Sequence, residues 1–217
     1  MRHSAIRFSV ILALTAYAAM PIAANTQGLY ERFIAAVTTD RSEEVVALLA
    51  RGIDPNTVDP NGDPALLVAA RAGFEPTVDA LLRAGAKVDA KNRFGDRPVM
   101  VAALGGHLGI VKKLVTRGAE INAPGWTPLI YAATSGREEV LRYLLGIGAD
   151  VNAQSPNGTT ALMMAVREGH AGTVELLLAK GADANHRNEN GATALGWAKR
   201  GGFVAIEQAL RRRGATE

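Results

Sequence analysis

The chain has 217 residues, of which 48% are hydrophobic, 21% charged and 5% aromatic, a composition typical of a globular protein with enough apolar side chain to fill a core. It contains no cysteine, which excludes disulfides, thiolate nucleophiles and cysteine-based metal sites. The formal net charge is +3, and Arg2 and Arg7 account for most of it, so the rest of the chain gives little support to nucleic-acid binding.

The N-terminus has the pattern of a secretory signal peptide. Arg2, His3 and Arg7 precede an apolar run over residues 8–20, and small residues follow. We therefore expect residues 1–24 to be removed by cleavage before Asn25, with a weaker alternative site after Ala18. A membrane anchor is the other interpretation, but the run is shorter than the roughly 20 apolar residues that span a bilayer. The prediction is an exported protein, periplasmic or secreted, whose mature domain (residues 25–217) does not span a membrane.

The rest of the chain is built from repeats. A glycine closes a leucine-rich segment six times, at intervals of 33, 33, 30, 33 and 33 residues. A period of this length predicts one supersecondary unit stacked on copies of itself, which is a solenoid with a long, open surface. The six glycines are Gly52, Gly85, Gly118, Gly148, Gly181 and Gly214.

Each unit is predicted to contain two short helices. Thr160 can cap the first helix with its hydroxyl, and Thr127 before Pro128 repeats this start. Where threonine is absent, Asp63 and Asp96 are expected to cap instead. The second helix has one apolar stripe, and a glycine suited to left-handed backbone ends it. The stripes are Val45, Leu48 and Leu49; Val78, Leu81 and Leu82; Val111, Leu114 and Val115; Val140, Leu144 and Leu145; and Val174, Leu177 and Leu178.

These residues resemble the ankyrin repeat. The family's Thr-Pro-Leu-His helix start is approached at 127–130 and 160–163, and its Gly-Ala-Asp-Val-Asn ending is present at 148–152. The resemblance covers about residues 29–215 and implies an all-α repeat solenoid, in which β-hairpin-like loops join helix-turn-helix units. The chain departs from the family at the helix-start histidine, a structural position. Its replacements are Leu67, Met100, Ile130, Met163 and Gly196.

The pattern predicts six units, at about 29–61, 62–94, 95–124, 125–157, 158–190 and 191–217. The first unit lacks the usual helix start, and the last ends in three consecutive arginines. Both are expected to be caps, which close the ends of a solenoid core with polar surface.

The sequence shows no arrangement of residues suited to catalysis. Acyl or proton transfer needs a nucleophile, a base and an orienting group around an enclosed site, and no phosphate-binding glycine loop is present. His107 and His170 occupy equivalent corners of two repeats and are interpreted as structural, whereas His186 is expected to be exposed to solvent. We therefore expect no enzyme activity, no cofactor and no metal.

Positions that differ between repeats are the candidates for a binding surface. The resemblance implies that the hairpin tips and the ends of the first helices line one concave face. Phe94, Leu104 and Trp126 lie at such positions and are expected to contact a protein partner, with Phe94 and Trp126 as the anchors. The alternative for Trp126 is that its ring fills a local gap. Arginines are expected to surround these anchors and to face an acidic or polar rim, namely Arg71, Arg93, Arg167, Arg187 and Arg200.

The one short interval falls beside Trp126. Asn122 precedes Gly125 by three residues, whereas Asn152 precedes Gly158 by six, so this hairpin has lost its tip. The gap could receive a protruding partner, or it could be neutral trimming of a surface loop. Tyr131 and Trp197 occupy a helix position that is otherwise apolar, and they are expected to pack between repeats.

The sequence thus favours an exported, non-catalytic module that binds a protein, and we expect it to be a monomer. Two alternatives remain open: a scaffold that self-associates, and an accessory subunit of an exported enzyme. Nucleic-acid binding is a weaker alternative.

Overall fold

The computed structural model describes residues 20–216, and α-helices account for most of that range. The first nineteen residues of the predicted signal peptide lie outside the described residues, so the signal peptide and the limits of the individual units stay predictions. The helices are α1 (Met20–Thr38), α2 (Ser42–Ala50), α3 (Ala65–Ala72), α4 (Glu75–Arg83), α5 (Pro98–Gly105), α6 (Leu108–Thr116), α7 (Pro128–Thr134), α8 (Glu138–Gly146), α9 (Ala161–Arg167), α10 (Ala171–Ala179), α11 (Ala194–Gly201) and α12 (Val204–Arg212).

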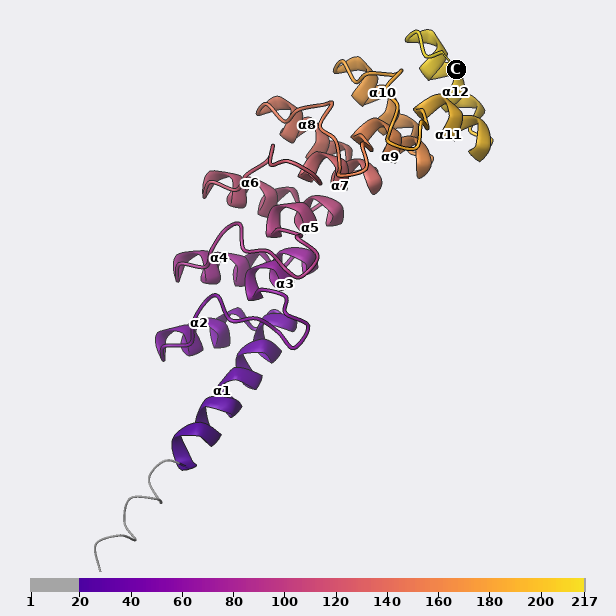
Figure 1. Cartoon of the computed structure of the whole chain (residues 1–217). Coiled ribbons are helices and arrows are strands. Elements are labelled where there is room, and N and C mark those ends of the chain that lie inside the picture. The colour runs from indigo at the N-terminus through magenta and orange to yellow at the C-terminus, as the bar shows by residue number, and fades with distance from the viewer. Residues whose placement is uncertain (1–19, 217) are drawn as a thin grey trace, which may run out of the picture.

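The helices form two parallel columns, as Figure 1 shows. The odd-numbered helices contact one another in chain order from α1 to α11, and the even-numbered helices do so from α2 to α12. Each helix also packs against its partner in the same pair. Between residues 20 and 216 the chain has no sheet, only isolated bridges such as Val58 with Pro64 at the base of a hairpin. The predicted all-α repeat solenoid is confirmed.

Threonine caps three of the odd-numbered helices, as predicted. The Oγ1 atoms of Thr127, Thr160 and Thr193 accept hydrogen bonds from the backbone N–H three residues later, at 3.3, 3.3 and 3.0 Å. The prediction that Asp63 and Asp96 cap α3 and α5 is wrong, because neither helix has a side-chain cap. Asp63 forms an ion pair with Arg71 instead, and Asp96 accepts a hydrogen bond from Tyr131. Each carboxylate is therefore occupied by a neighbour other than its helix end.

The two corner histidines have the predicted structural role. The Nε2 atom of His107 lies 3.2 Å from the Arg71 carbonyl oxygen, and that of His170 lies 3.1 Å from the Thr134 carbonyl oxygen, each in the preceding unit. A Cβ at Gly73 would come within 2.6 Å of the His107 ring, so the close approach needs glycine there. His186 differs from its prediction: it is half-buried, and its Nε2 atom lies 2.7 Å from the Gly158 carbonyl oxygen.

The core lies between the two columns of helices. The first two residues of every predicted stripe are buried, including Leu48, Leu114 and Leu144. Each odd-numbered helix from α3 to α11 buries at least two alanines together with larger apolar side chains. Fully burying one leucine contributes roughly 1.5–3 kcal/mol. No buried side-chain nitrogen or oxygen in the described range lacks a hydrogen-bond partner. Burial repeated along the stack therefore holds this cysteine-free chain together.

An asparagine after α6, α8 and α10 links one hairpin base to the next. Asn122 Oδ1 accepts a hydrogen bond from Asp150 N at 2.9 Å, while its Nδ2 donates to the Gly148 carbonyl oxygen at 2.9 Å. Asn152 and Asn185 make the same pair of bonds to the unit that follows. These bonds keep successive hairpins in register along one side of the solenoid.

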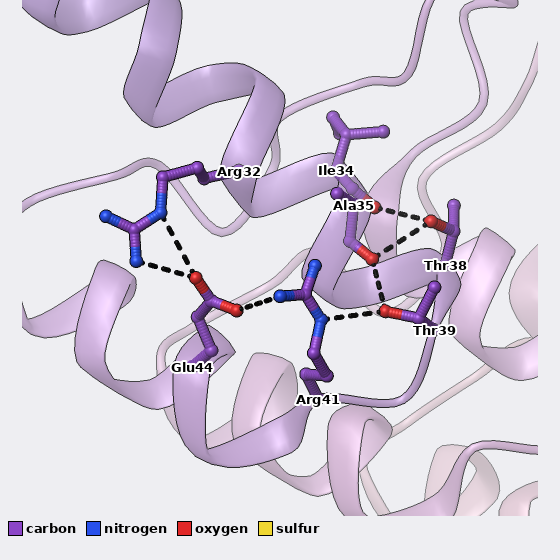
Figure 2. Close-up of polar contacts among 7 residues, drawn as sticks. All are labelled: Arg32, Ile34, Ala35, Thr38, Thr39, Arg41 and Glu44. Atoms are coloured by element: carbon purple, nitrogen blue, oxygen red, sulfur yellow. Dashed lines mark hydrogen bonds and ion pairs between the residues drawn. The ribbon is translucent and has the colours of Figure 1, made fainter.

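The first helix pair is held by polar contacts of its own. Arg32 and Arg41 both donate to Glu44, at 2.7 and 2.6 Å, and Arg41 also donates to the Thr39 hydroxyl (Figure 2). Asp40 takes the corner position that is glycine in the later units, with a φ of 53°. Aspartate adopts left-handed backbone more readily than most residues, although less readily than glycine, so this corner carries only modest strain.

No helix within residues 20–216 combines the length and the apolar character that a membrane crossing requires.

Candidate functional site

The predicted binding residues lie on the two kinds of element that the resemblance implied. Arg93, Phe94 and Arg187 are in hairpins, and Trp126 lies two residues before the start of α7. Leu104 lies in the last turn of α5. The other three occupy the position of Leu104 in their own units, namely Arg71 in α3, Arg167 in α9 and Arg200 in α11. All are exposed except Leu104, which is half-buried.

Phe94 is the most exposed large apolar side chain among the described residues, at 72%. Its hairpin is nevertheless ordered by Asn92, whose buried Oδ1 atom accepts hydrogen bonds from Phe94 N at 3.0 Å and Asp96 N at 2.9 Å. The Arg93 guanidinium carbon lies 4.7 Å from the centre of the Phe94 ring, a cation–π arrangement. An aromatic ring is therefore presented to solvent on a fixed turn.

Trp126 is intermediate between the two predictions made for it. Its side chain is 38% exposed. The Trp126 and Tyr131 rings pack edge to face, with their centroids 6.0 Å apart and their planes at 90°. Such aromatic pairs contribute about 0.5–1.5 kcal/mol beyond area burial. One side of the indole is thus supported by the protein, while the other remains open.

Tyr131 connects the two aromatic anchors, a role that sequence reasoning missed. Its hydroxyl donates to Asp96 Oδ1 at 2.5 Å, and Asp96 is two residues beyond Phe94. Burial, with help from the Asp96 carboxylate, raises the pKa of the Tyr131 phenol above its ordinary value. Tyr131 and Trp197 both pack partly buried against the core, as predicted. The only signal for the second role was that Tyr131 has a hydroxyl at a position where other units have apolar residues.

The repeats diverge in chemistry at this place. The position of Arg71, Arg167 and Arg200 is occupied by Leu104 in the third unit and by Thr134 in the fourth. Trp126 stands where the second and third units have Asp63 and Asp96. Two adjacent units thus replace charged residues with apolar or neutral ones. We call the resulting patch the notch surface, and it consists of Arg93, Phe94, Leu104, Trp126 and Tyr131.

The shortened hairpin adjoins the notch surface. Hairpin-base bridges are present at Gln154 with Thr160 and at Arg187 with Thr193, whereas the short segment before α7 and the full-length hairpin before α5 have none. The next hairpin comes close to the gap, since a Cβ at Gly125 would lie 3.8 Å from Pro156 Cγ. The three missing residues therefore leave Trp126 without a covering tip from its own hairpin.

The outlying arginines are partly engaged by the protein itself. Arg71 pairs with Asp63 at 2.7 Å, and Arg167 pairs with Glu168 at 2.8 Å. Arg187 donates to the Gly191 carbonyl oxygen at 3.1 Å. The Arg167–Glu168 pair is exposed and contributes about 0–1 kcal/mol, so a partner could displace it at little cost. The Asp63 carboxylate is buried, so its pair with Arg71 is held more firmly.

Two shallow hollows, of about 430 and 570 Å³, lie elsewhere, among the even-numbered helices. The first is lined by residues such as Glu75, Asp79 and Lys113, in which Lys113 Nζ lies 2.5 Å from Asp79 Oδ2. The second includes Glu138 and Arg142, which pair at 3.1 Å. Ion pairs within each hollow thus engage several of its charged groups. Within the described residues, no group of three histidines and carboxylates is placed to hold a metal ion.

A stack of helix pairs with repeat-equivalent capping, corner and hairpin contacts defines a helical repeat protein whose variable residues lie on its surface. The family model described as "Ankyrin repeats (3 copies)" matches residues 33–124, 66–155 and 147–216. The chain belongs to the ankyrin repeat family. Ankyrin repeats are generally protein–protein interaction modules and are generally not catalytic. No curated protein matches the chain.

Proposed function

We propose that this chain binds a partner protein through the notch surface. The observation that supports this most directly is the pair of exposed aromatic rings before α5 and α7, Phe94 on a fixed turn and Trp126 braced by Tyr131. The arginines at the equivalent positions of the flanking units are the proposed polar rim. The odd-numbered helix ends and the hairpin tips form the binding face, and no catalytic step is involved.

The energetics of such a surface favour recognition. Aromatic residues and arginine dominate binding energy where they become buried at an interface, and truncating one such residue can cost about 2 kcal/mol or more. The Phe94 turn and the Trp126–Tyr131 pair exist before any partner arrives, so little conformational freedom is lost when it binds.

The decisive experiment compares truncations of the anchors with a matched exposed control. The protein is used to capture partners from the compartment in which it is found, and the Trp126→Ala and Phe94→Ala variants are tested in parallel. Each is expected to weaken capture by about tenfold or more, with helicity and melting temperature nearly unchanged. Val204→Ala is the control, because Val204 is 65% exposed but lies at the start of α12.

If Trp126→Ala instead lowers the melting temperature sharply, the ring belongs to the core and not to a binding surface. If both aromatic variants capture the partner as well as Val204→Ala does, the notch surface is not the binding site.

We further propose that the chain acts outside the cytoplasm, after removal of residues 1–24. The support is the charged start, the apolar run and the small residues that follow. Cleavage before Asn25 would shorten α1 from its N-terminal end and leave its buried residues Phe33, Ala36 and Val37 in place. Mass spectrometry of the N-terminus of the exported protein tests this, and an intact Met1 there would contradict it.

We propose that the protein is a monomer. Light scattering on the purified protein is expected to give the mass of one chain at all concentrations tested. A mass that rises with concentration would favour the self-associating scaffold.

A further inference from the structure

We infer that the occupant of the notch surface is an acidic protein segment, in which a bulky apolar side chain inserts between Phe94 and Trp126 and a neighbouring carboxylate meets Arg93. This inference rests on the proposed function and adds the chemistry of the partner.

The gap beside Trp126 sets the shape of the occupant. The hairpin before α7 lacks three residues that the other hairpins have, and the tip that would cover the indole is therefore missing. The Phe94 turn lies on one side of this gap, linked through Asp96 to Tyr131, while Pro156 approaches Gly125 from the next hairpin. A flat partner would leave the gap empty, so a protruding loop or an extended segment fits it better.

The lining of the gap selects an apolar side chain. Trp126 and Phe94 are exposed rings, and Leu104 replaces the arginine found at its position in the second, fifth and sixth units. The Tyr131 hydroxyl is already bonded to Asp96, and the Tyr131 ring packs against Trp126. Burying a side chain here would remove apolar surface from water on both partners.

The charges around the gap select an acid. The carboxylate nearest the anchors, Asp96, is occupied on both oxygens, by the Tyr131 hydroxyl and by Asn92 Nδ2 at 3.2 Å. Arg93 stacks on Phe94 and forms no ion pair among the described residues. Lys91, two residues before Arg93, is also exposed and adds positive charge to this hairpin. A carboxylate beside the inserted side chain would complement these cations.

The test is a selection of short random peptides on the purified protein, followed by affinity measurements of the enriched peptides on variants. The enriched peptides are expected to combine an aromatic or aliphatic residue with aspartate or glutamate. Their affinity is expected to fall about tenfold on Arg93→Glu, because attraction becomes repulsion. It is also expected to fall as salt rises, since exposed charges are screened.

A second variant fills the gap without removing any anchor. The residues Gln-Ser-Pro, copied from 154–156, are inserted between Ala123 and Pro124 to restore the usual hairpin length. This insertion is expected to abolish binding while helicity and melting are retained. The same insertion between Asn190 and Gly191, in a distant hairpin, is the matched control and is expected to leave binding unchanged.

The outcomes separate the two proposals. If binding depends on Phe94 and Trp126 but survives Arg93→Glu and the insertion, the acidic segment is wrong and the proposed function stands. Binding that is unchanged in the Phe94→Ala and Trp126→Ala variants overturns both the acidic segment and the proposed function. Enriched peptides that are neutral or basic, no enrichment at all, or displacement by single-stranded oligothymidylate through the same aromatic residues would each overturn the acidic segment.

Discussion

Asp40 shows at the scale of one residue how the first unit departs from the others. Its backbone is left-handed, with a φ of 53°, where the later corners have glycine. Its Oδ1 atom accepts a hydrogen bond of 2.8 Å from the Thr77 hydroxyl, and Thr77 is completely buried in α4. The side chain thus satisfies a buried donor of the next unit, and this offsets the strain of its own backbone.

Three substitutions at Asp40 should therefore fall in a definite order. Asp40→Asn is expected to be nearly neutral, because asparagine tolerates left-handed backbone and still offers an oxygen. Asp40→Gly relieves the strain but leaves the Thr77 hydroxyl unpaired, at a cost of about 1 kcal/mol after the two effects offset. Asp40→Ala loses the bond and keeps the strain, at about 2–3 kcal/mol. Urea unfolding gives the order, and a neutral Asp40→Ala would contradict the account.

Tyr131 gives a prediction about pH. Its raised pKa in the folded protein means that folding favours the protonated phenol. The resulting stabilisation is fully present below about pH 10, the ordinary tyrosine value, and is lost as pH rises toward the folded pKa. Tyr131→Phe should be less stable than the wild type by about 1 kcal/mol at neutral pH, since it loses the bond to Asp96. The two proteins should converge in alkaline urea titrations, and a difference that widens would contradict this.

At the scale of one element, α5 replaces one way of starting a helix with another. Arg97 occupies the position of the capping threonines, and the helix has no side-chain cap. Arg97 Nη1 instead lies 2.5 Å from Glu120 Oε2 and 3.6 Å from Asp89 Oδ1. Asp89 itself stands where other units have the linking asparagine. The arginine in place of threonine and the aspartate in place of asparagine occur together, because the Arg97 guanidinium pairs with the carboxylates of Asp89 and Glu120.

A double-mutant cycle tests whether Arg97 and Asp89 are coupled. Arg97→Thr alone should give little gain, since the new cap is offset by the carboxylates of Asp89 and Glu120 left without their partner. Combined with Asp89→Asn, it should restore both the cap and the asparagine link. The gain in unfolding free energy of the double variant should therefore exceed the sum of the two single changes by about 0.5–1 kcal/mol. Unfolding in urea provides the four free energies. Additive effects would show that the two positions act independently.

At the scale of the whole molecule, each helix pair packs mainly against its neighbours in the stack. Stability in such a chain is approximately a sum of unit terms and of interfaces between adjacent units. A central unit has an interface on both sides and a terminal unit has one. The same substitution should therefore lower stability differently in a central unit and in a terminal unit.

Leu144 and Leu210 are a matched pair for this effect, since both are fully buried at the same position of an even-numbered helix. Leu144→Ala should lower the stability of the stack as a whole by about 2–5 kcal/mol. Leu210→Ala should release mainly α11 and α12, with earlier hydrogen exchange there and a smaller effect elsewhere. Equal loss of protection across all units in both variants would instead indicate one cooperative block.

The sequence by itself determined the solenoid, the buried leucine stripes, the threonine caps and the corner histidines. Each of these depends on contacts within a unit or with the next one, and such contacts recur at the repeat period. Only the tertiary structure decided the partners of Asp63 and Asp96, the half-buried state of His186 and the support of Trp126 by Tyr131. Those side chains have alternatives within reach from two neighbouring units, and which one they contact depends on how the units lie against each other in space.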